Sequence, residues 1–195
     1  DPVRTWLDPF ADRSGPLQPA RRALARVLGR RIHTLQSRFD LSVVASQHMA
    51  VYLRAHGVPH VVRVPFGVDE RFFVPPPPRD PTAPVRLLYA GRLGVEKGAK
   101  TLLDALPSLL DLPNVELTVV GRGALADRFD AVKHPRYRRL GFIADPDELA
   151  ALYRAHSVYL ALSPFETFGL SLLEAMASGL VPVGADAGGV AEQIE

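Results

Sequence analysis

From residue 85 onward the chain alternates short apolar runs with amphipathic runs, and this alternation limits its fold more than any other feature. The expected strands are residues 85–90, 115–120, 138–141, 157–162 and 181–183. The expected helices between them are residues 99–110, 124–132, 146–155 and 169–178. The strands are continuously apolar, which is typical of a parallel sheet covered by helices on both faces. The sequence therefore predicts an α/β fold with a Rossmann-like parallel sheet.

A proline-rich segment separates this region from the rest of the chain. The four consecutive prolines at 75–78 fit neither a helix nor a central strand, so residues 76–84 are predicted to be a stiff linker. The linker divides the chain into residues 1–75 and a second domain at 85–195. In the first part, residues 1–16 are expected to be irregular. The other expected elements there are a helix at 19–36, a buried strand at 41–45, a helix at 47–56 and a strand at 60–64.

Composition excludes several classes of protein. The net charge of +2 is far from that of a nucleic-acid binder, so no nucleic-acid partner is expected. The chain has no cysteine, which excludes disulfides and thiolate metal sites and fits a reducing, cytoplasmic compartment. It has no apolar run long enough to span a membrane. The arginine-rich helix 19–36 is interpreted first as a surface helix. The alternative is peripheral contact with anionic lipid on the inner face of the cell membrane.

Glycines and charged residues follow the predicted strands at the points where the strands end. In an open parallel sheet, ligands bind outside the carboxyl ends of the strands. Arg92 and Lys97 follow the first strand in a loop bounded by glycines, Gly91 and Gly98. A diphosphate needs cationic partners, and an arginine can bind its oxygens in a bidentate manner. This edge of the sheet is therefore predicted to bind an anionic, polyhydroxylated ligand.

The predicted helix at 169–178 adds two further features to that edge. Gly169 allows a phosphate to approach the free N–H groups at the helix start. Glu174 is the only charge in an otherwise apolar helix, so its carboxylate needs a partner, either a structural salt bridge or ligand hydroxyls, the latter favoured. Glu166 precedes the helix, and a pair of carboxylates also occurs in glycoside hydrolases. A hydrolase does not account for the cations, however, whereas transfer from an activated sugar does.

The sequence offers little for a metal or a dinucleotide. The histidines lack metal-ligand spacing, and the chain has no Asp-x-Asp pair that could hold a metal against a diphosphate. The stretch Gly121-Arg122-Gly123 is not a dinucleotide-binding fingerprint. No cofactor is therefore expected.

Four sequence motifs, taken together with their order along the chain, resemble those of the family 4 retaining glycosyltransferases, which have the GT-B fold. The run from Glu166 to Gly179 (ETFGLSLLEAMASG) resembles the E-x7-E motif of that family, and residues 91–98 resemble its GRL…EKG loop. The segment PFGVD at 65–69, followed by Phe73, resembles the segment that leads into its second domain. Residues 188–192 (GGVAE) resemble its GG-x-x-E segment. The resemblance extends from about residue 18 to the end of the chain.

The resemblance implies a role for each matching residue. Arg92 and Lys97 would hold the donor diphosphate and stabilise its charge, and Glu166 would contact the sugar near the reacting carbon. These three are the expected catalytic residues. The other residues expected to contact the donor are Glu174 at the ribose, Ile143 beside the base, and Gly91, Phe168, Gly169 and Leu170. The family uses no metal at the diphosphate.

The resemblance also implies the activity and the domain organisation. The full-length protein is expected to transfer a hexosyl group, mannosyl or glucosyl, from a nucleotide-diphosphate sugar to a lipid or polysaccharide acceptor. The alternatives are a GT-B epimerase or phosphorylase and a non-catalytic nucleotide-sugar-binding module. Residues 1–75 match only the last part of the acceptor-side N-terminal domain, and residues 85–195 match an incomplete donor-binding domain. The 195-residue chain alone is therefore expected to be inactive or nearly so.

Overall fold

The computed structural model describes residues 18–73, 78 and 80–194. The chain forms two compact units, one ending at Phe66 and the other beginning at Gly67. The segment expected to be irregular at 1–16 lies outside the described residues, as do residues 76, 77 and 79 of the predicted linker. The division into domains at 1–75, 76–84 and 85–195 stays a prediction.

The first unit contains two helices and a two-stranded parallel sheet. Its elements are α2 (Gln18–Gln36), β1 (Ser42–Val44), α3 (Gln47–Ala55) and β2 (Val61–Arg63). The Ser46 hydroxyl caps α3 by accepting a hydrogen bond from the Met49 N–H at 3.2 Å. Gly57 follows α3 with a φ of +82°, a conformation that glycine adopts without strain. The four elements expected in this part of the sequence are therefore present.

The prediction that residues 41–45 form a buried strand is wrong in its burial. Val43 at the centre of β1 is 60% exposed, and Leu41 before it is 54% exposed. The small core of this unit consists of Ala50, Leu53, Val58 and Val61. Successive side chains of a strand point to opposite faces, and in this unit α3 provides core residues for only one face of β1 and β2.

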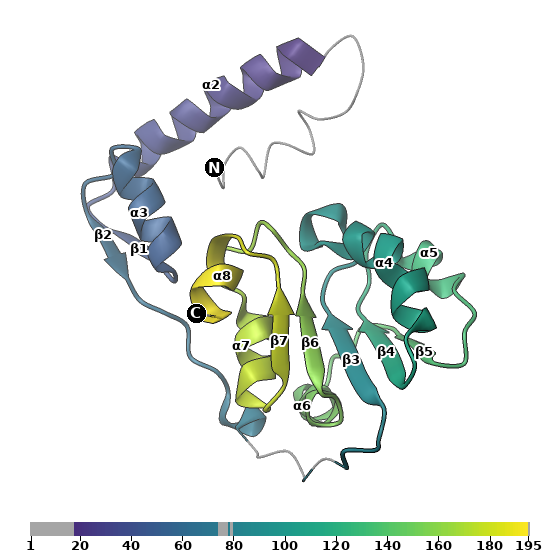
Figure 1. Ribbon diagram of the computed structural model, residues 1–195. Coiled ribbons are helices and arrows are strands. Elements are labelled where there is room, and N and C mark those ends of the chain that lie inside the picture. The colour runs from purple at the N-terminus through teal and green to yellow at the C-terminus, as the bar shows by residue number, and fades with distance from the viewer. Residues whose placement is uncertain (1–17, 74–77, 79, 195) are drawn as a thin grey trace. The chain divides into compact units, whose positions relative to one another are not determined.

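The second unit is an α/β layer structure built on five parallel strands (Figure 1). Its elements are η1 (Glu70–Phe72), β3 (Val85–Ala90), η2 (Val95–Lys97), α4 (Ala99–Asp111), β4 (Val115–Val120), α5 (Ala126–Asp130), β5 (Tyr137–Leu140), α6 (Pro146–Arg154), β6 (Val158–Ala161), α7 (Leu170–Ala177), β7 (Val181–Gly184) and α8 (Gly188–Ile194). The strand order is β5-β4-β3-β6-β7, and every pair is parallel. The predicted parallel α/β sheet is confirmed.

Alternate side chains of the strands build one core on each face of the sheet. Leu87 of β3 belongs to a buried cluster with Leu102 of α4 and Phe129 of α5. Its neighbour Leu88 belongs to a second cluster with residues of η1, α6 and α7, including Tyr153. Because both faces are covered, the strands carry apolar side chains at consecutive positions, which is the pattern seen in the sequence.

Local sequence signals explain the start of α6, but they do not account for the extent of α5 or for α8. The carboxylate of Asp145 accepts a hydrogen bond from the Asp147 N–H at 2.9 Å and Pro146 opens α6, as predicted. The helix expected at 124–132 is shorter, since α5 covers Ala126–Asp130. The sequence did not predict α8, because Gly188 and Gly189 at its start have low helix propensity.

The buried His156 makes the stability of the second unit depend on pH. The ring is 6% exposed, with Nδ1 2.6 Å from the Leu152 carbonyl oxygen and Nε2 2.9 Å from the Thr118 hydroxyl. The carbonyl can only accept, so the neutral ring carries its proton on Nδ1 and accepts the Thr118 hydroxyl at Nε2. Burial lowers the pKa of His156 below its ordinary value.

We therefore expect the free energy of unfolding to fall as the pH drops from about 7 to about 5. The unfolded state takes up the proton first, because its histidine pKa is higher, so the stabilisation is present above that value and is lost in acid. Urea unfolding across this range should show a flatter pH dependence for His156→Gln than for the wild type. A matched control is His60→Gln, which replaces an exposed histidine instead of a buried one. Equal slopes for wild type and His156→Gln would contradict the assignment.

Candidate active site

The loop after β3 is held against the end of its strand by a buried tyrosine. The Tyr89 hydroxyl lies 3.0 Å from the carbonyl oxygens of Arg92 and Lys97, so its single proton is shared between the backbone of these two residues. Burial raises the pKa of Tyr89, and the phenol therefore keeps its proton for this contact. The turn of η2 then places Lys97 directly before Gly98, which has a φ of +73° and opens α4.

The loop after β6 is fastened to the β3 loop. The Ser163 hydroxyl donates to the Glu96 carbonyl at 3.0 Å and accepts from the Phe165 N–H at 3.3 Å. The Tyr159 hydroxyl donates to the Ala90 carbonyl at 2.8 Å. A side chain at Gly98 would overlap the backbone carbonyl of Leu162, so the two loops pack backbone against backbone. These contacts fix the distance between the cationic loop and the loop that carries Glu166.

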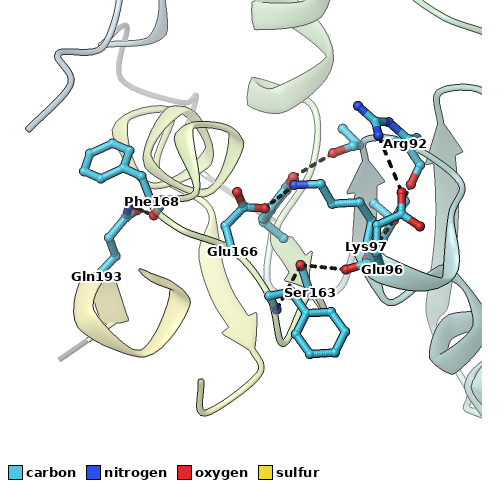
Figure 2. A network of polar contacts seen from close by, with 11 residues as sticks. Arg92, Glu96, Lys97, Ser163, Glu166, Phe168 and Gln193 are labelled. Atoms are coloured by element: carbon cyan, nitrogen blue, oxygen red, sulfur yellow. Dashed lines mark hydrogen bonds and ion pairs between the residues drawn. The ribbon is translucent and has the colours of Figure 1, made fainter. Parts of the chain in front are cut away.

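Two ion pairs join the charged side chains of these loops (Figure 2). Lys97 Nζ lies 2.6 Å from Glu166 Oε2, and Arg92 lies 3.6 Å from Glu96. The Arg92 side chain is 70% exposed, whereas Lys97 is 35% and Glu166 is 20% exposed. Lys97 and Glu166 therefore form the shorter and less exposed ion pair, and Arg92 reaches into solvent at the edge of the site.

The start of α7 and the start of α8 hold the Glu166 loop from the other side. Gly169 precedes α7 with a φ of +89°, and no side chain caps the helix start. The Glu166 carbonyl accepts a hydrogen bond from the Gly189 N–H at 2.7 Å. The Phe168 carbonyl accepts a hydrogen bond from the Gln193 amide of α8, as Figure 2 shows. α8 thus supports the loop that leads into α7.

Two adjoining pockets lie at the carboxyl edge of the sheet. The first contains the Lys97–Glu166 pair, and both share Gly91, Arg92 and Ser171 in their walls. The second has a volume of about 350 Å³ and mainly apolar walls, with the half-buried Glu174 at one side. A strongly charged pocket beside an apolar one suits a ligand that has an anionic group linked to a flat, apolar group.

Glu174 has a hydroxyl rather than a cation beside it. The Tyr153 hydroxyl lies 3.5 Å from Glu174 Oε2, and among the described residues no lysine, arginine or histidine forms an ion pair with Glu174. Burial raises the pKa of Glu174, and the contact with Tyr153 offsets part of that rise. The salt bridge considered from the sequence is therefore not formed by the described residues. The carboxylate can still accept donors from a ligand.

The structure gathers most of the residues predicted to form the site. The first pocket is lined by Gly91, Arg92, Lys97, Glu166 and Gly169, and the second by Gly91, Arg92, Ile143 and Glu174. Phe168 and Leu170 line neither pocket. Phe168 is buried beneath the loop, with 7% of its surface exposed, and Leu170 is 43% exposed.

Sequence reasoning missed several residues that support or line the pockets. They are Tyr89, Tyr159, Ser163, Arg122, Phe142 and Gln193. Ser163, two residues after β6, and Arg122, two residues after β4, follow strands at the predicted binding edge, but the sequence assigned neither of them a role in the site. The two tyrosines lie inside apolar strands, where an aromatic residue is expected to belong to the core.

Comparison with known proteins gives matches over both units of the chain. The family model of glycosyl transferases group 1 matches residues 84–195. Glycogen synthase from Mycobacterium tuberculosis is 33% identical over 180 residues, which are 86% of this chain and 43% of that protein. The GDP-mannose-dependent alpha-(1-6)-phosphatidylinositol dimannoside mannosyltransferase of the same species is 38% identical over 136 residues, covering 63% of this chain and 35% of the relative.

A solved structure also resembles this chain over both of its units. The crystal structure of Anabaena HepE in complex with UDP-glucose aligns with a TM-score of 0.67 and 26% identity, over 86% of this chain and 51% of that one. The chain thus spans about half of that structure and less than half of the curated relatives. The five-stranded sheet together with the small parallel sheet confirms the predicted GT-B fold. The chain belongs to the group 1 glycosyl transferases, the family 4 enzymes that its motifs resemble, and covers mostly the C-terminal domain region of their fold.

Proposed function

We propose that the full-length protein is a retaining glycosyltransferase that moves a hexosyl group, mannosyl or glucosyl, from a nucleotide-diphosphate sugar to a lipid or polysaccharide acceptor. The observation that carries the proposal is the pair of pockets: Arg92, Lys97 and Glu166 surround one, and an apolar pocket with Glu174 adjoins it. A nucleotide-diphosphate sugar has the matching order of groups, from sugar through diphosphate and ribose to base.

The donor follows that order across the two pockets. The diphosphate of the donor lies at Arg92 and Lys97. The diphosphate oxygens replace Glu96 and Glu166 as partners of these two cations. Glu166, released from Lys97, accepts hydrogen bonds from the sugar hydroxyls. Glu174 accepts from the ribose hydroxyls, which supplies the donors that its partly buried carboxylate lacks. The base lies beside Ile143 in the apolar pocket.

The residues near the start of α7 complete the donor site. Gly169 brings the backbone close to the sugar and phosphate, and Phe168 and Leu170 act through their backbone groups. Gly91, shared by the two pockets, lets the diphosphate pass close to the β3 loop.

The chemistry needs stabilisation of the leaving group above all. When the bond between the sugar carbon and the phosphate oxygen breaks, negative charge develops on the diphosphate, and Lys97 and Arg92 stabilise that charge. The acceptor hydroxyl attacks the same face of the sugar and passes its proton to the departing phosphate oxygen, so the configuration at the carbon is retained. Two side-chain cations, Arg92 and Lys97, supply the positive charge, and the reaction proceeds without a metal or another cofactor.

The acceptor is proposed to be a lipid or a polysaccharide. Among the relatives, one is a glycogen synthase and another a phosphatidylinositol dimannoside mannosyltransferase. We place the protein in the cytoplasm, in peripheral contact with the inner face of the cell membrane. Among the described residues no helix is long and apolar enough to cross a bilayer. In the described part of α2, however, apolar and arginine side chains are both exposed, including Val27, Ile32, Arg30 and Arg31.

Vesicle flotation tests the membrane contact. The full-length protein should float with vesicles that contain anionic lipid and remain with the free protein when the vesicles are neutral. The double variant Arg30→Glu, Arg31→Glu should lose this binding, because it reverses the charge that attracts the headgroups. Equal flotation with both kinds of vesicle, or an unchanged variant, would remove the lipid contact from the proposal.

Product analysis of the full-length protein tests the proposed reaction. A panel of UDP-, GDP- and ADP-sugars should contain at least one donor that raises the melting temperature with increasing concentration. Incubation of that donor with lipid and polysaccharide acceptors should release the nucleoside diphosphate and give a product with the anomeric configuration of the donor. Binding of a donor without any transfer would show a nucleotide-sugar-binding module instead.

A further inference from the structure

The apolar pocket carries an exposed arginine, Arg122, whose guanidinium lies over an aromatic ring. The guanidinium carbon of Arg122 lies 4.3 Å from the centre of the Phe142 ring, which is 59% exposed. The backbone holds both residues in place: the Gly121 N–H donates to the Gly141 carbonyl at 3.1 Å, and the Leu93 N–H donates to the Arg122 carbonyl at 2.9 Å. A cation over an aromatic face is attracted to it, so the guanidinium has a preferred position at the pocket wall.

The N–H groups of this arginine have no oxygen partner within the described part of the chain. Among the described residues, the Arg122 guanidinium contacts the ring of Phe142, and no carboxylate forms an ion pair with this guanidinium. Arg92 and Lys97 differ, because each is already paired with a glutamate. Arg122 therefore presents a fork of N–H donors at the pocket without a protein group to receive them.

The position of Arg122 in the pocket points to the base of the ligand. The pocket has three charged residues: Arg92, which also lines the first pocket, Glu174 and Arg122. In the proposed function Arg92 is occupied by the diphosphate and Glu174 by the ribose. Arg122 remains, beside Phe142 and Ile143, on the side of the pocket assigned to the base.

We propose that Arg122, held over Phe142, is a specificity-determining residue that selects a guanine nucleotide as the donor. The proposal rests on the proposed function. Arginine is a donor-only group with parallel N–H bonds, and guanine offers two adjacent acceptors, O6 and N7. Uracil offers a single acceptor, O4, on the corresponding edge. Adenine has an amino group, which is a donor, beside N7, so an arginine N–H would face another hydrogen-bond donor.

Isothermal titration of the full-length protein with GDP, UDP and ADP tests this selection. The wild type should bind GDP at least about tenfold more tightly than ADP, with UDP between them. In Arg122→Ala the three dissociation constants should lie within about threefold of one another. The main change should be weaker binding of GDP, because the bidentate contact with guanine is lost. Phe142→Leu should lose part of the preference, since the guanidinium loses its ring. The matched control is Arg128→Ala, which removes an exposed arginine of α5 and should keep the wild-type order.

The outcomes separate this proposal from the proposed function. Tightest binding of UDP or ADP by the wild type would overturn the guanine selection and leave the glycosyltransferase in place. If Arg122→Ala lowered the affinity for all three nucleotides by the same factor, the arginine would act as a general charge, and this result would also overturn the guanine selection. If none of the three nucleotides bound to the folded wild type, the proposed function itself would fail.

Discussion

Replacement of Lys97 by alanine should lower kcat for sugar transfer by the full-length protein by about 10²- to 10³-fold, while the protein stays folded. Lys97 is half-buried between the β3 and β6 loops, and its Nζ is 2.6 Å from Glu166. In the proposed reaction it stabilises charge that appears only as the bond to the diphosphate breaks. An interaction made mainly in the transition state affects kcat more than KM.

Lys100→Ala is the matched control for this experiment. Lys100 lies on α4 close to Lys97 in the sequence, is 55% exposed, and pairs with Asp104 at 2.5 Å. Its removal changes the net charge by the same amount but should change kcat by less than about twofold, because an exposed ion pair contributes little. Steady-state kinetics and thermal unfolding of both variants provide the comparison. Transfer by Lys97→Ala at the wild-type rate would mean that the leaving group is stabilised elsewhere.

Gly121→Ala should destabilise the protein by about 3 kcal/mol, because the new methyl group meets both backbone strain and a steric clash. Gly121 has a φ of +127°, which a residue with a side chain rarely adopts. A Cβ at this position would also overlap the carbonyl oxygen of Gly91, in the loop that carries Arg92. The β3 and β4 loops would have to separate, which disturbs both pockets together.

Gly141→Ala controls for the loss of a glycine at the same edge of the sheet. The Gly141 carbonyl accepts the Gly121 N–H at 3.1 Å, but a Cβ on Gly141 would meet no atom within 4 Å. Urea unfolding should therefore show a change below about 0.5 kcal/mol for Gly141→Ala. If the two variants had the same stability, the close approach of the β3 and β4 loops would not be as tight as described.

The sequence predicted the sheet because its strands are short apolar runs that end in glycine or in charged residues. Two features of the structure, one in each unit, could not be predicted from this pattern. Gly188 and Gly189 begin α8, although their propensity favours a turn, because the contact with the Glu166 carbonyl holds them there. The exposure of Val43 depends on which elements pack against β1, and the apolar pattern alone does not contain that information.

In the candidate site, the sequence predicted several of the residues that line the pockets but not which side chains contact one another. Motif position placed Arg92, Lys97 and Glu166 at the carboxyl edge, but the pairing of Lys97 with Glu166 depends on how two loops far apart in sequence meet. The residues that make them meet are Tyr89 and Ser163, through hydrogen bonds to backbone carbonyls. Such contacts leave no periodic signal, because any carbonyl at the right distance can accept them.

Hydrogen exchange with and without a saturating donor tests most directly whether the carboxyl edge of the sheet is the donor site. On addition of GDP-mannose or UDP-glucose to the full-length protein, exchange should slow in the loops at 91–98, 121–123 and 163–171. The loops at the opposite edge, 112–114, 133–136 and 155–157, should exchange as before. Slower exchange at the opposite edge alone, or no change at the carboxyl edge with a donor that binds, would contradict the donor site described for this chain.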